Sequence, residues 1–447
     1  MDNRDRNRSW LIKGGRVVDP ANQRDGIADV LVRDGRIAAV GQIEAPSDVE
    51  VIDATDLIVA PGLIDLHVHL RVPGGEAKET IATGTAAAAA GGFTTICCMP
   101  NTNPALDSVE TLNDLKQRID QDALIRVHPI AAITYGRKGE KAVDFDALAA
   151  AGAIGFSDDG DTTANSAIMR TALEASKRLD RPVMVHCEDK PLAAGAMNEG
   201  EVSRALGIPG IPPEAEEIII ARDLMLARLT GGWLHVCHVS TGRGAELVRQ
   251  AKAEGVDVTA EVMPHHLVMS DAWVAGDRTL LNVNEPAGSR AEAADPNTKV
   301  NPPLRPEADT RQLLAALQDG TFDIIATDHA PHASPEKEGS PYTKAAFGLS
   351  GSEFALPLML ALVRAGHVTL SDLIYRLSTV PARLLRVPLG TLSEGSAADI
   401  VIFDPNERWQ VTPEALKTKS PNTPLLGMEL RGRARMVLVD GEERYHA

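Results

Sequence analysis

The chain of 447 residues contains only four cysteines, which is too few for a disulfide-stabilised framework. Cys97, Cys98, Cys187 and Cys237 all lie in apolar, strand-like stretches, and none of them forms a C-x-x-C pair. This usage is typical of buried thiols in a reduced cytosolic protein. It argues against a zinc site built from cysteine.

Long hydrophobic runs and a positive net charge are also missing. The longest apolar run, residues 354–363, contains Pro357 and is too short to span a bilayer. The start, MDNRDRNRSW, lacks the apolar core of a secretory signal, so we expect a cytoplasmic protein. The net charge of −17 argues against nucleic acid or an anionic membrane as a partner. An anionic small-molecule substrate would need local cations to attract it.

The middle of the chain alternates between strand-like and helix-like segments. Strands are predicted at 63–70, 94–99, 125–133, 153–158, 182–187, 233–239, 257–263 and 322–327. Helical patterns lie between most of them, at 79–90, 109–121, 165–179, 213–229, 244–253 and 310–318, and another at 353–364 follows the last strand. Eight strands, each followed by a helix or a long loop, are typical of a (β/α)₈ TIM-type barrel. A doubly wound open sheet would also alternate, but it has no reason to stop at eight strands.

Both ends of the chain read differently from this middle. Residues 10–60 contain short strand-like stretches in which apolar and polar residues alternate; these are rich in Val and Ile and are separated by Gly and Asp-Gly turns. A similar pattern occurs near the C-terminus. We therefore predict an α/β protein in which residues 61–388 form the barrel. Residues 1–60 and 389–447 would together form a small composite β-sandwich domain.

The first predicted barrel strand carries the most informative stretch, LIDLHVHLR at residues 63–71. His67 and His69 lie two apart and so point the same way, and Arg71 continues that face at the end of the strand. Burying two imidazoles on a strand costs free energy unless their nitrogens have bonding partners, and a divalent metal is the usual partner. A hydrogen-bonded pair of core histidines is the alternative, which the spacing and the following arginine disfavour.

Other polar residues collect at the ends of later strands, where barrel enzymes carry their catalytic groups. They are Asn101, Asp158, Asp159, His186, Glu188, Asp189, His238, Ser240, Asp328, His329 and His332. Histidine and carboxylate ligands on separate strands suit Zn²⁺, and two metals can share a hydroxide that attacks a polarised substrate. The residues that would bind such a pair of metals are His67, His69, Asp159, His186, His238 and Asp328.

These motifs together resemble those of dihydroorotases, and more narrowly the bacterial monofunctional type within the amidohydrolase superfamily. In chain order they are DLHVHLR, KETIATGTAAAAAGGFTTICCMPNTNP, FSDDG, VHCED, HVSTGRG, EVMPHH, VNPPLR and IATDHAPH. The resemblance runs from about residue 60 to residue 392 and extends to the composite β domain. It implies reversible closure of N-carbamoyl-L-aspartate to L-dihydroorotate with loss of water, the third step of de novo pyrimidine (UMP) synthesis.

The resemblance also implies roles for individual residues. One zinc would be held by His67 and His69, the other by His186 and His238, with one or two zinc ions per subunit and two favoured. Asp159 would bridge the metals, with Asp158 as the alternative. Asp328 would be both a ligand and the acid/base that moves the proton when a metal-bound hydroxide attacks the ring amide. The substrate carboxylate would be bound by Arg71, Asn101, Asn301 and His332.

Two other readings remain open. One is a hydantoinase or dihydropyrimidinase-like cyclic amidase. Related cyclic-amide hydrolases, such as hydantoinases and many other dihydroorotases, bridge their metals with a carboxylated lysine, and FSDDG has no lysine at the corresponding position. A non-catalytic scaffold for aspartate transcarbamoylase would be expected to have lost ligands, and all six are present here. We expect a homodimer, and association with aspartate transcarbamoylase remains possible for an active protein.

Several residues depart from the family pattern or lack a partner in sequence. Val72 stands where the family's LREPG stretch has an acid. The sequence does not decide whether the loops at 271–299 and 332–348 act as lids or are plain connections. Glu188 and Asp189 are candidates for orienting His186. The remaining histidines are assigned core, structural or surface roles: His128, His235, His265, His266, His367 and His446.

Overall fold

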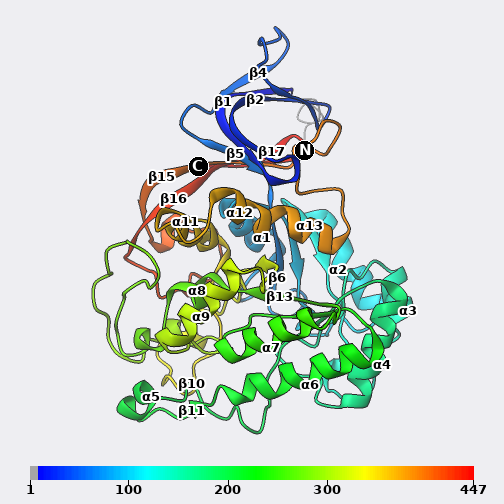
Figure 1. The fold of residues 1–447 in the computed structure, drawn as a ribbon, viewed down its shortest axis with the longest axis vertical. Helices are drawn as coiled ribbons and strands as arrows, with labels where there is room; N and C mark the ends of the chain where they lie inside the picture. The colour runs from blue at the N-terminus through cyan, green and yellow to red at the C-terminus, as the bar shows by residue number, and fades with distance from the viewer. Residues whose placement is uncertain (1–8) are drawn as a thin grey trace.

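A closed barrel of parallel strands forms the centre of the molecule (Figure 1). The computed structural model describes residues 9–447. The barrel strands are β6 (Leu63–Val68), β7 (Phe93–Cys98), β8 (Arg126–Pro129), β9 (Val183–Val185), β12 (Leu234–Val236), β13 (Val258–Val262) and β14 (Ile324–Ile325). The position between β8 and β9 is filled by Phe156, which forms parallel bridges to Ala131 and Val183, and a bridge from Val68 to His329 closes the ring. The predicted (β/α)₈ barrel is confirmed.

The fourth strand is much shorter than the predicted segment 153–158. Within it, Phe156 alone forms parallel bridges to neighbouring strands. The reason lies in Asp158, whose Oδ1 accepts the backbone N–H groups of Ile133 (2.9 Å) and Thr134 (3.0 Å). A side chain therefore satisfies donors that a longer ladder would have paired.

Helices cover the outside of the barrel at the seven predicted places. They are α1 (Ile81–Ala90), α2 (Val109–Asp122), α4 (Ser166–Leu179), α6 (Glu214–Thr230), α7 (Gly242–Ala253), α9 (Glu307–Gln318) and α11 (Ala355–Arg364). The side chains of Thr80, Ser108 and Asn165 cap the N-termini of α1, α2 and α4. Their buried faces and the strands share one large hydrophobic core, to which Val72 also belongs.

Short helices occur where no helix was predicted. They are α3 (Phe145–Ala150), α5 (Glu201–Leu206), α8 (Pro264–Val268), α10 (Ser334–Lys337), α12 (Leu370–Ile374) and α13 (Val380–Leu385). A small parallel pair, β10 (Met197–Asn198) and β11 (Gly210–Ile211), lies in the loop after β9. The stretch 332–348, expected to be a loop, therefore contains the single turn of α10. The stretch 271–299 has only the 3₁₀ turns at Asp271–Trp273 and Pro296–Thr298.

The second unit is a sheet built from both ends of the chain, drawn above the barrel in Figure 1. Its strands are β1 (Trp10–Asp19), β2 (Arg24–Arg33), β3 (Arg36–Gly41), β4 (Glu50–Asp53), β5 (Ile58–Pro61), β15 (Ile400–Gln410), β16 (Glu429–Val439) and β17 (Glu442–His446). The order is β17-β16-β15-β5-β1-β2-β3, with β4 also paired to β1. Residues from both ends, including Trp10, Val30, Ile400 and Leu438, share one core. The sheet domain from both termini is thus confirmed; residues 1–8, with most of the polar start, lie outside the described residues.

The two units are joined by polar and close backbone contacts. Arg126 on β8 forms a forked pair with Asp399 (3.0 and 3.1 Å), just before β15. Gly432 of β16 lies so near α11 that an added Cβ would stand 2.6 Å from Leu360 Cδ1. In residues 9–447, no helix has the length and apolar character needed to cross a membrane.

Candidate metal centre and active site

His67 and His69 both face the carboxylate of Asp159 from the end of β6. His67 Nε2 lies 3.4 Å from Asp159 Oδ1, and His69 Nε2 lies 3.5 Å from Asp159 Oδ2. Their ring centroids are 5.4 Å apart, as expected for residues on the same face of a strand. All three side chains are buried.

His186 and His238 reach the same carboxylate from the other side, at the ends of β9 and β12. His238 Nε2 is 3.5 Å from Asp159 Oδ1, and His186 Nδ1 is 3.8 Å from it. The two imidazoles also contact one another, with His186 Nδ1 2.9 Å from His238 Nε2. Four histidines therefore surround one buried carboxylate.

Asp328, at the end of β14, completes the cluster. Its Oδ1 lies 2.9 Å from His69 Nε2 and 3.6 Å from His67 Nε2. Burial alone would raise the pKa of Asp328, but His69 and the other imidazoles outweigh it and lower that pKa to about 2. All six residues predicted as metal ligands are thus brought together.

The cluster has the donors that a divalent cation needs. His67 Nε2 and Asp159 Oδ1 are buried without a hydrogen-bond partner, although each points at the other. Three sets of ligand atoms each lie within 4.8 Å of one another: those of His67, His69 and Asp328, those of His67, Asp159 and His238, and those of His67, Cys237 and Glu261. Burial lowers the pKa of His67, but the negative charges of Asp159 and Glu261 outweigh it and raise that pKa well above the usual range, so these carboxylates make the position attractive to a cation. Imidazole nitrogen and carboxylate oxygen suit Zn²⁺, and the residues fit a bound metal.

The two adjacent aspartates of FSDDG have different surroundings. Asp158 accepts the Ile133 and Thr134 amides through Oδ1, and the hydroxyls of Thr134 (2.7 Å) and Thr163 (2.9 Å) through Oδ2. Asp159 faces the histidines instead. Asp159, and not Asp158, is therefore the aspartate that faces the histidine cluster.

A cavity of about 320 Å³ opens beside this cluster. Arg71, Asn101, Asn301 and His332, the four residues predicted to bind substrate, all line it. Arg71 does not continue the strand face as expected: its φ is +61°, and its Nε donates to the carbonyl of Pro331 at 3.1 Å. The turn carries the guanidinium to within 3.3 Å of His332 Nε2, on the wall formed by the segment after β14.

The two asparagines are held by contacts with other side chains of the site, and Asn301 Nδ2 lies 3.4 Å from His186 Nε2. Asn101 Oδ1 accepts from His69 Nδ1 at 2.8 Å, which leaves Nε2 of His69 facing the carboxylates. Asn301 donates through Nδ2 to Glu188 Oε1 at 2.9 Å. Glu188 also pairs with Lys190 (2.7 Å), a cavity-lining cation that sequence reasoning did not single out. Arg71 and Lys190 supply the local positive charge that a chain of net charge −17 needs for an anionic ligand.

Comparisons with known proteins agree with this geometry. Residues 56–243 match a family model described as dihydro-orotase-like. The chain is 44% identical to a dihydroorotase of Syntrophus aciditrophicus over 97% of its length and 99% of the relative's. It is also 44% identical to one of Aquifex aeolicus, over 97% and 99%.

The chain belongs to the dihydroorotase family. The resemblance seen in its motifs is thereby confirmed. Solved structures with the same fold include an L-hydantoinase (dihydropyrimidinase) from Arthrobacter aurescens, with a TM-score of 0.84 and 26% identity over 97% of this chain and 95% of that one. A D-hydantoinase structure gives 0.82 and 28% identity over 97% and 95%.

One buried acid of this dihydroorotase family member was missed by sequence reasoning. Glu261 accepts a hydrogen bond from His67 Nδ1 (2.6 Å), from His235 Nε2 (3.1 Å) and from the backbone N–H of His238 (3.2 Å). It lies inside β13, whereas the functional residues predicted from the sequence lie at or near the ends of the strands. His235, assigned to the core, is buried as expected, and Glu261 is its partner.

Proposed function

We propose that this protein is a zinc-dependent dihydroorotase, which interconverts N-carbamoyl-L-aspartate and L-dihydroorotate in pyrimidine (UMP) biosynthesis. The observation that carries the proposal is a buried cluster of four histidines and two carboxylates beside a cavity that holds a guanidinium. Near-full-length relatives that are named dihydroorotase support it.

The metal would be held by the residues that converge on Asp159. They are His67, His69, His186, His238, Asp159 and Asp328, enough for one or two zinc ions with two favoured. A bound zinc ion supplies an activated water and polarises the carbonyl that is attacked. Glu261 and Asn101 hold the Nδ1 atoms of His67 and His69, so that both Nε2 atoms face the metal position.

Asp328 is the group that moves the proton. Its carboxylate lines the cavity, and its lowered pKa keeps it ionised and able to accept a proton at neutral pH. In hydrolysis of dihydroorotate, Asp328 takes the proton of the attacking water and delivers it to the ring nitrogen that leaves. In the synthetic direction the same carboxylate removes the proton from the attacking carbamoyl nitrogen.

The substrate carboxylate is bound by the cavity wall that carries Arg71 and His332. Arg71 has two further guanidinium nitrogens besides the Nε that Pro331 occupies, and these form charge-assisted hydrogen bonds with a carboxylate. Burial lowers the pKa of Arg71 to about 10, which leaves it charged at neutral pH. Burial and Arg71 lower the pKa of His332 to about 2, so that His332 is a neutral imidazole in this pocket. Asn101 and Asn301 complete the pocket.

Hydantoinase activity is the second candidate, because hydantoinases share this fold with TM-scores of 0.82 to 0.84. Two observations favour dihydroorotase. Identity to the hydantoinase structures is 26–28%, against 44% to dihydroorotases, and Asp159 rather than a lysine occupies the centre of the cluster. The third reading, a non-catalytic scaffold for aspartate transcarbamoylase, is disfavoured because all six ligand positions converge.

Metal analysis combined with an ultraviolet assay of dihydroorotate tests the proposal. We expect zinc in the purified protein, loss of turnover after chelation, and recovery when zinc is returned. A protein that stays inactive with zinc bound, or that prefers hydantoin or dihydrouracil, would refute it. We also predict a cytoplasmic homodimer that is able to associate with aspartate transcarbamoylase. Sedimentation of the purified protein, with and without that enzyme, measures the oligomeric state and the association.

A further inference from the structure

A segment from the C-terminal part of the chain lies against the wall of the cavity. Residues 417–423 (KTKSPNT), here called the C-terminal strap, run between β15 and β16. Within the strap, Thr418, Ser420, Asn422 and Thr423 are buried. None of the strap residues lines the cavity itself.

Asn422 hydrogen-bonds three backbone groups of residues that do line the cavity. Its Oδ1 accepts the N–H of His332 at 2.9 Å, and its Nδ2 donates to the carbonyls of Gly348 (3.1 Å) and Ala330 (3.4 Å). The side chain is 6% exposed, so these bonds do not compete with bulk water. One amide thus ties together the two chain segments that form this wall.

The same amide acts on the guanidinium through the backbone. Arg71 Nε donates to the carbonyl of Pro331, which lies between the two residues that Asn422 fixes. His332 Nε2 in turn donates to the carbonyl of Phe347 at 2.8 Å, beside Gly348. A shift of this backbone would therefore move both the anchor of Arg71 and the imidazole of His332.

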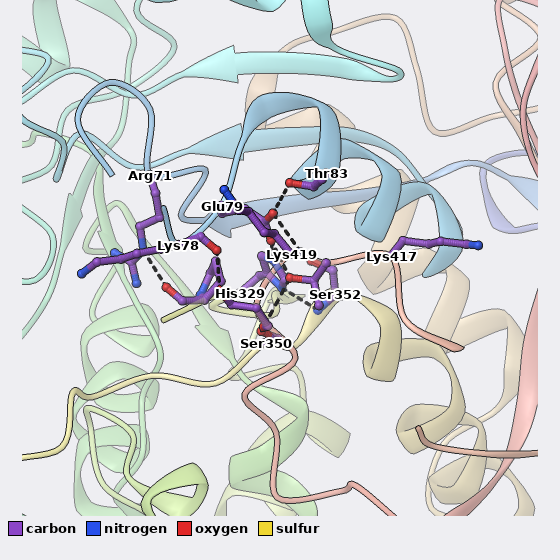
Figure 2. A network of polar contacts seen from close by, with 12 residues as sticks. Arg71, Lys78, Glu79, Thr83, His329, Ser350, Ser352, Lys417 and Lys419 are labelled. Atoms are coloured by element: carbon purple, nitrogen blue, oxygen red, sulfur yellow. Dashed lines mark hydrogen bonds and ion pairs between the residues drawn. The ribbon is translucent and has the colours of Figure 1, made fainter. Parts of the chain in front are cut away.

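The strap is itself anchored by two buried glutamates. Glu79 accepts the backbone N–H of Lys419 at 3.1 Å and the hydroxyl of Thr418, and it contacts His329 Nε2 at 3.3 Å (Figure 2). Glu353 accepts the N–H groups of Lys417 (2.9 and 3.1 Å) and Thr418 (3.1 Å). The carbonyl of His329 accepts the N–H of His69, so the network reaches the metal centre as well.

We propose that Asn422 is a positioning residue for the carboxylate-binding wall, and that the C-terminal strap brings it there. This inference rests on the proposed function for the identity of the anion. Asn422 touches no substrate. It sets the spacing between the Arg71 guanidinium and His332, and so it controls affinity for the carboxylate more than the rate of bond making.

The test uses Asn422→Ala in the full-length, zinc-loaded protein, with Asn22→Ala as a control at an exposed asparagine. Asn22 also makes side-chain bonds between distant segments, to Asp19, Thr391 and Ser393, but in the small domain. Losing buried hydrogen bonds predicts a rise in KM for dihydroorotate of about tenfold with kcat within about threefold. The control should leave both constants unchanged. An unchanged KM in Asn422→Ala, or an equal rise in the control, would overturn the proposal.

A substrate-free measurement separates this inference from the proposed function. Amide hydrogen exchange of the peptide containing His332 should be faster by about tenfold in Asn422→Ala and unchanged in Asn22→Ala. If the wild-type protein shows no dihydroorotase turnover, the proposed function is refuted, but the exchange result still decides the role of Asn422. Unchanged exchange in Asn422→Ala refutes that positioning role. Should Asn422→Ala fail to fold, Asn422→Asp decides. It keeps the acceptor for His332, loses the donor to Gly348 and must raise KM; a wild-type KM would overturn the proposal.

Discussion

Replacing Glu261 with glutamine tests how strongly the protein itself orients the metal ligands. The Glu261 carboxylate is fully buried and accepts three hydrogen bonds, the shortest from His67 Nδ1 at 2.6 Å. Burial would raise its pKa, but His67 and His235 lower it well below the usual range, so it is a carboxylate at neutral pH. Glutamine keeps one acceptor oxygen, loses the charge and places an amide NH₂ beside a donor.

The expected loss follows from the role of such outer partners. Removing an acid that hydrogen-bonds a metal-binding histidine typically weakens metal binding by about 10- to 100-fold, or ~1.4–2.7 kcal/mol of binding free energy. Competition with a chromophoric chelator measures the zinc dissociation constant directly, without any need for turnover. We expect the constant of Glu261→Gln to rise within that range while the protein stays folded.

Glu353→Gln is the matched control, because Glu353 is also a buried glutamate but accepts backbone N–H groups of the C-terminal strap. It should keep the zinc affinity of the wild type. A zinc constant for Glu261→Gln within about twofold of the wild type would refute the reasoning that this acid supports His67. The same conclusion would follow if both variants lost zinc equally.

Three further predictions concern turnover, substrate binding and pH. Asp328→Ala should keep the fold and lower kcat by about 10²- to 10⁴-fold in the ultraviolet assay, and wild-type rates would remove Asp328 from its proton-moving role. Arg71→Lys replaces a fork by a point charge and should raise KM by about tenfold, with a smaller change in kcat; an unchanged KM would contradict the carboxylate clamp. Burial raises the pKa of Glu353 from 4.5 to about 7, so the folded state holds its proton more tightly than the unfolded state. The wild type should therefore lose up to ~3 kcal/mol of unfolding free energy between pH 4.5 and 7 relative to Glu353→Gln, as measured by denaturant titration, and parallel curves would count against this.

The barrel could be predicted because its signals are local. Apolar runs of strand length alternate with helical periodicity, and His67 and His69 share a face because side chains alternate along a strand. The placement of polar groups at strand ends then located Asp159, His186, His238 and Asp328, all of which the structure brings together.

The features that were not predicted depend on contacts between distant segments. The positive φ of Arg71 turns its side chain towards Pro331, and no periodicity signals such a turn. Glu261 lies within a strand, where an acid is recognised as functional only once His67 and His235 are seen beside it. Asn422 belongs to a stretch without helix or strand pattern, and its importance comes from three bonds to residues at least 74 positions away.

The composite sheet also has a consequence for the order in which the protein is made. β5 pairs with β15, so the centre of the sheet is completed only after residues 400–403 leave the ribosome. The C-terminal strap emerges later still, although it supports a wall whose other residues were synthesised long before. A nascent chain that stops before β15 would carry all six metal-facing side chains and still lack a finished anion pocket. Premature termination before β15 should therefore give a protein that holds substrate weakly, even though its metal-facing side chains are all present.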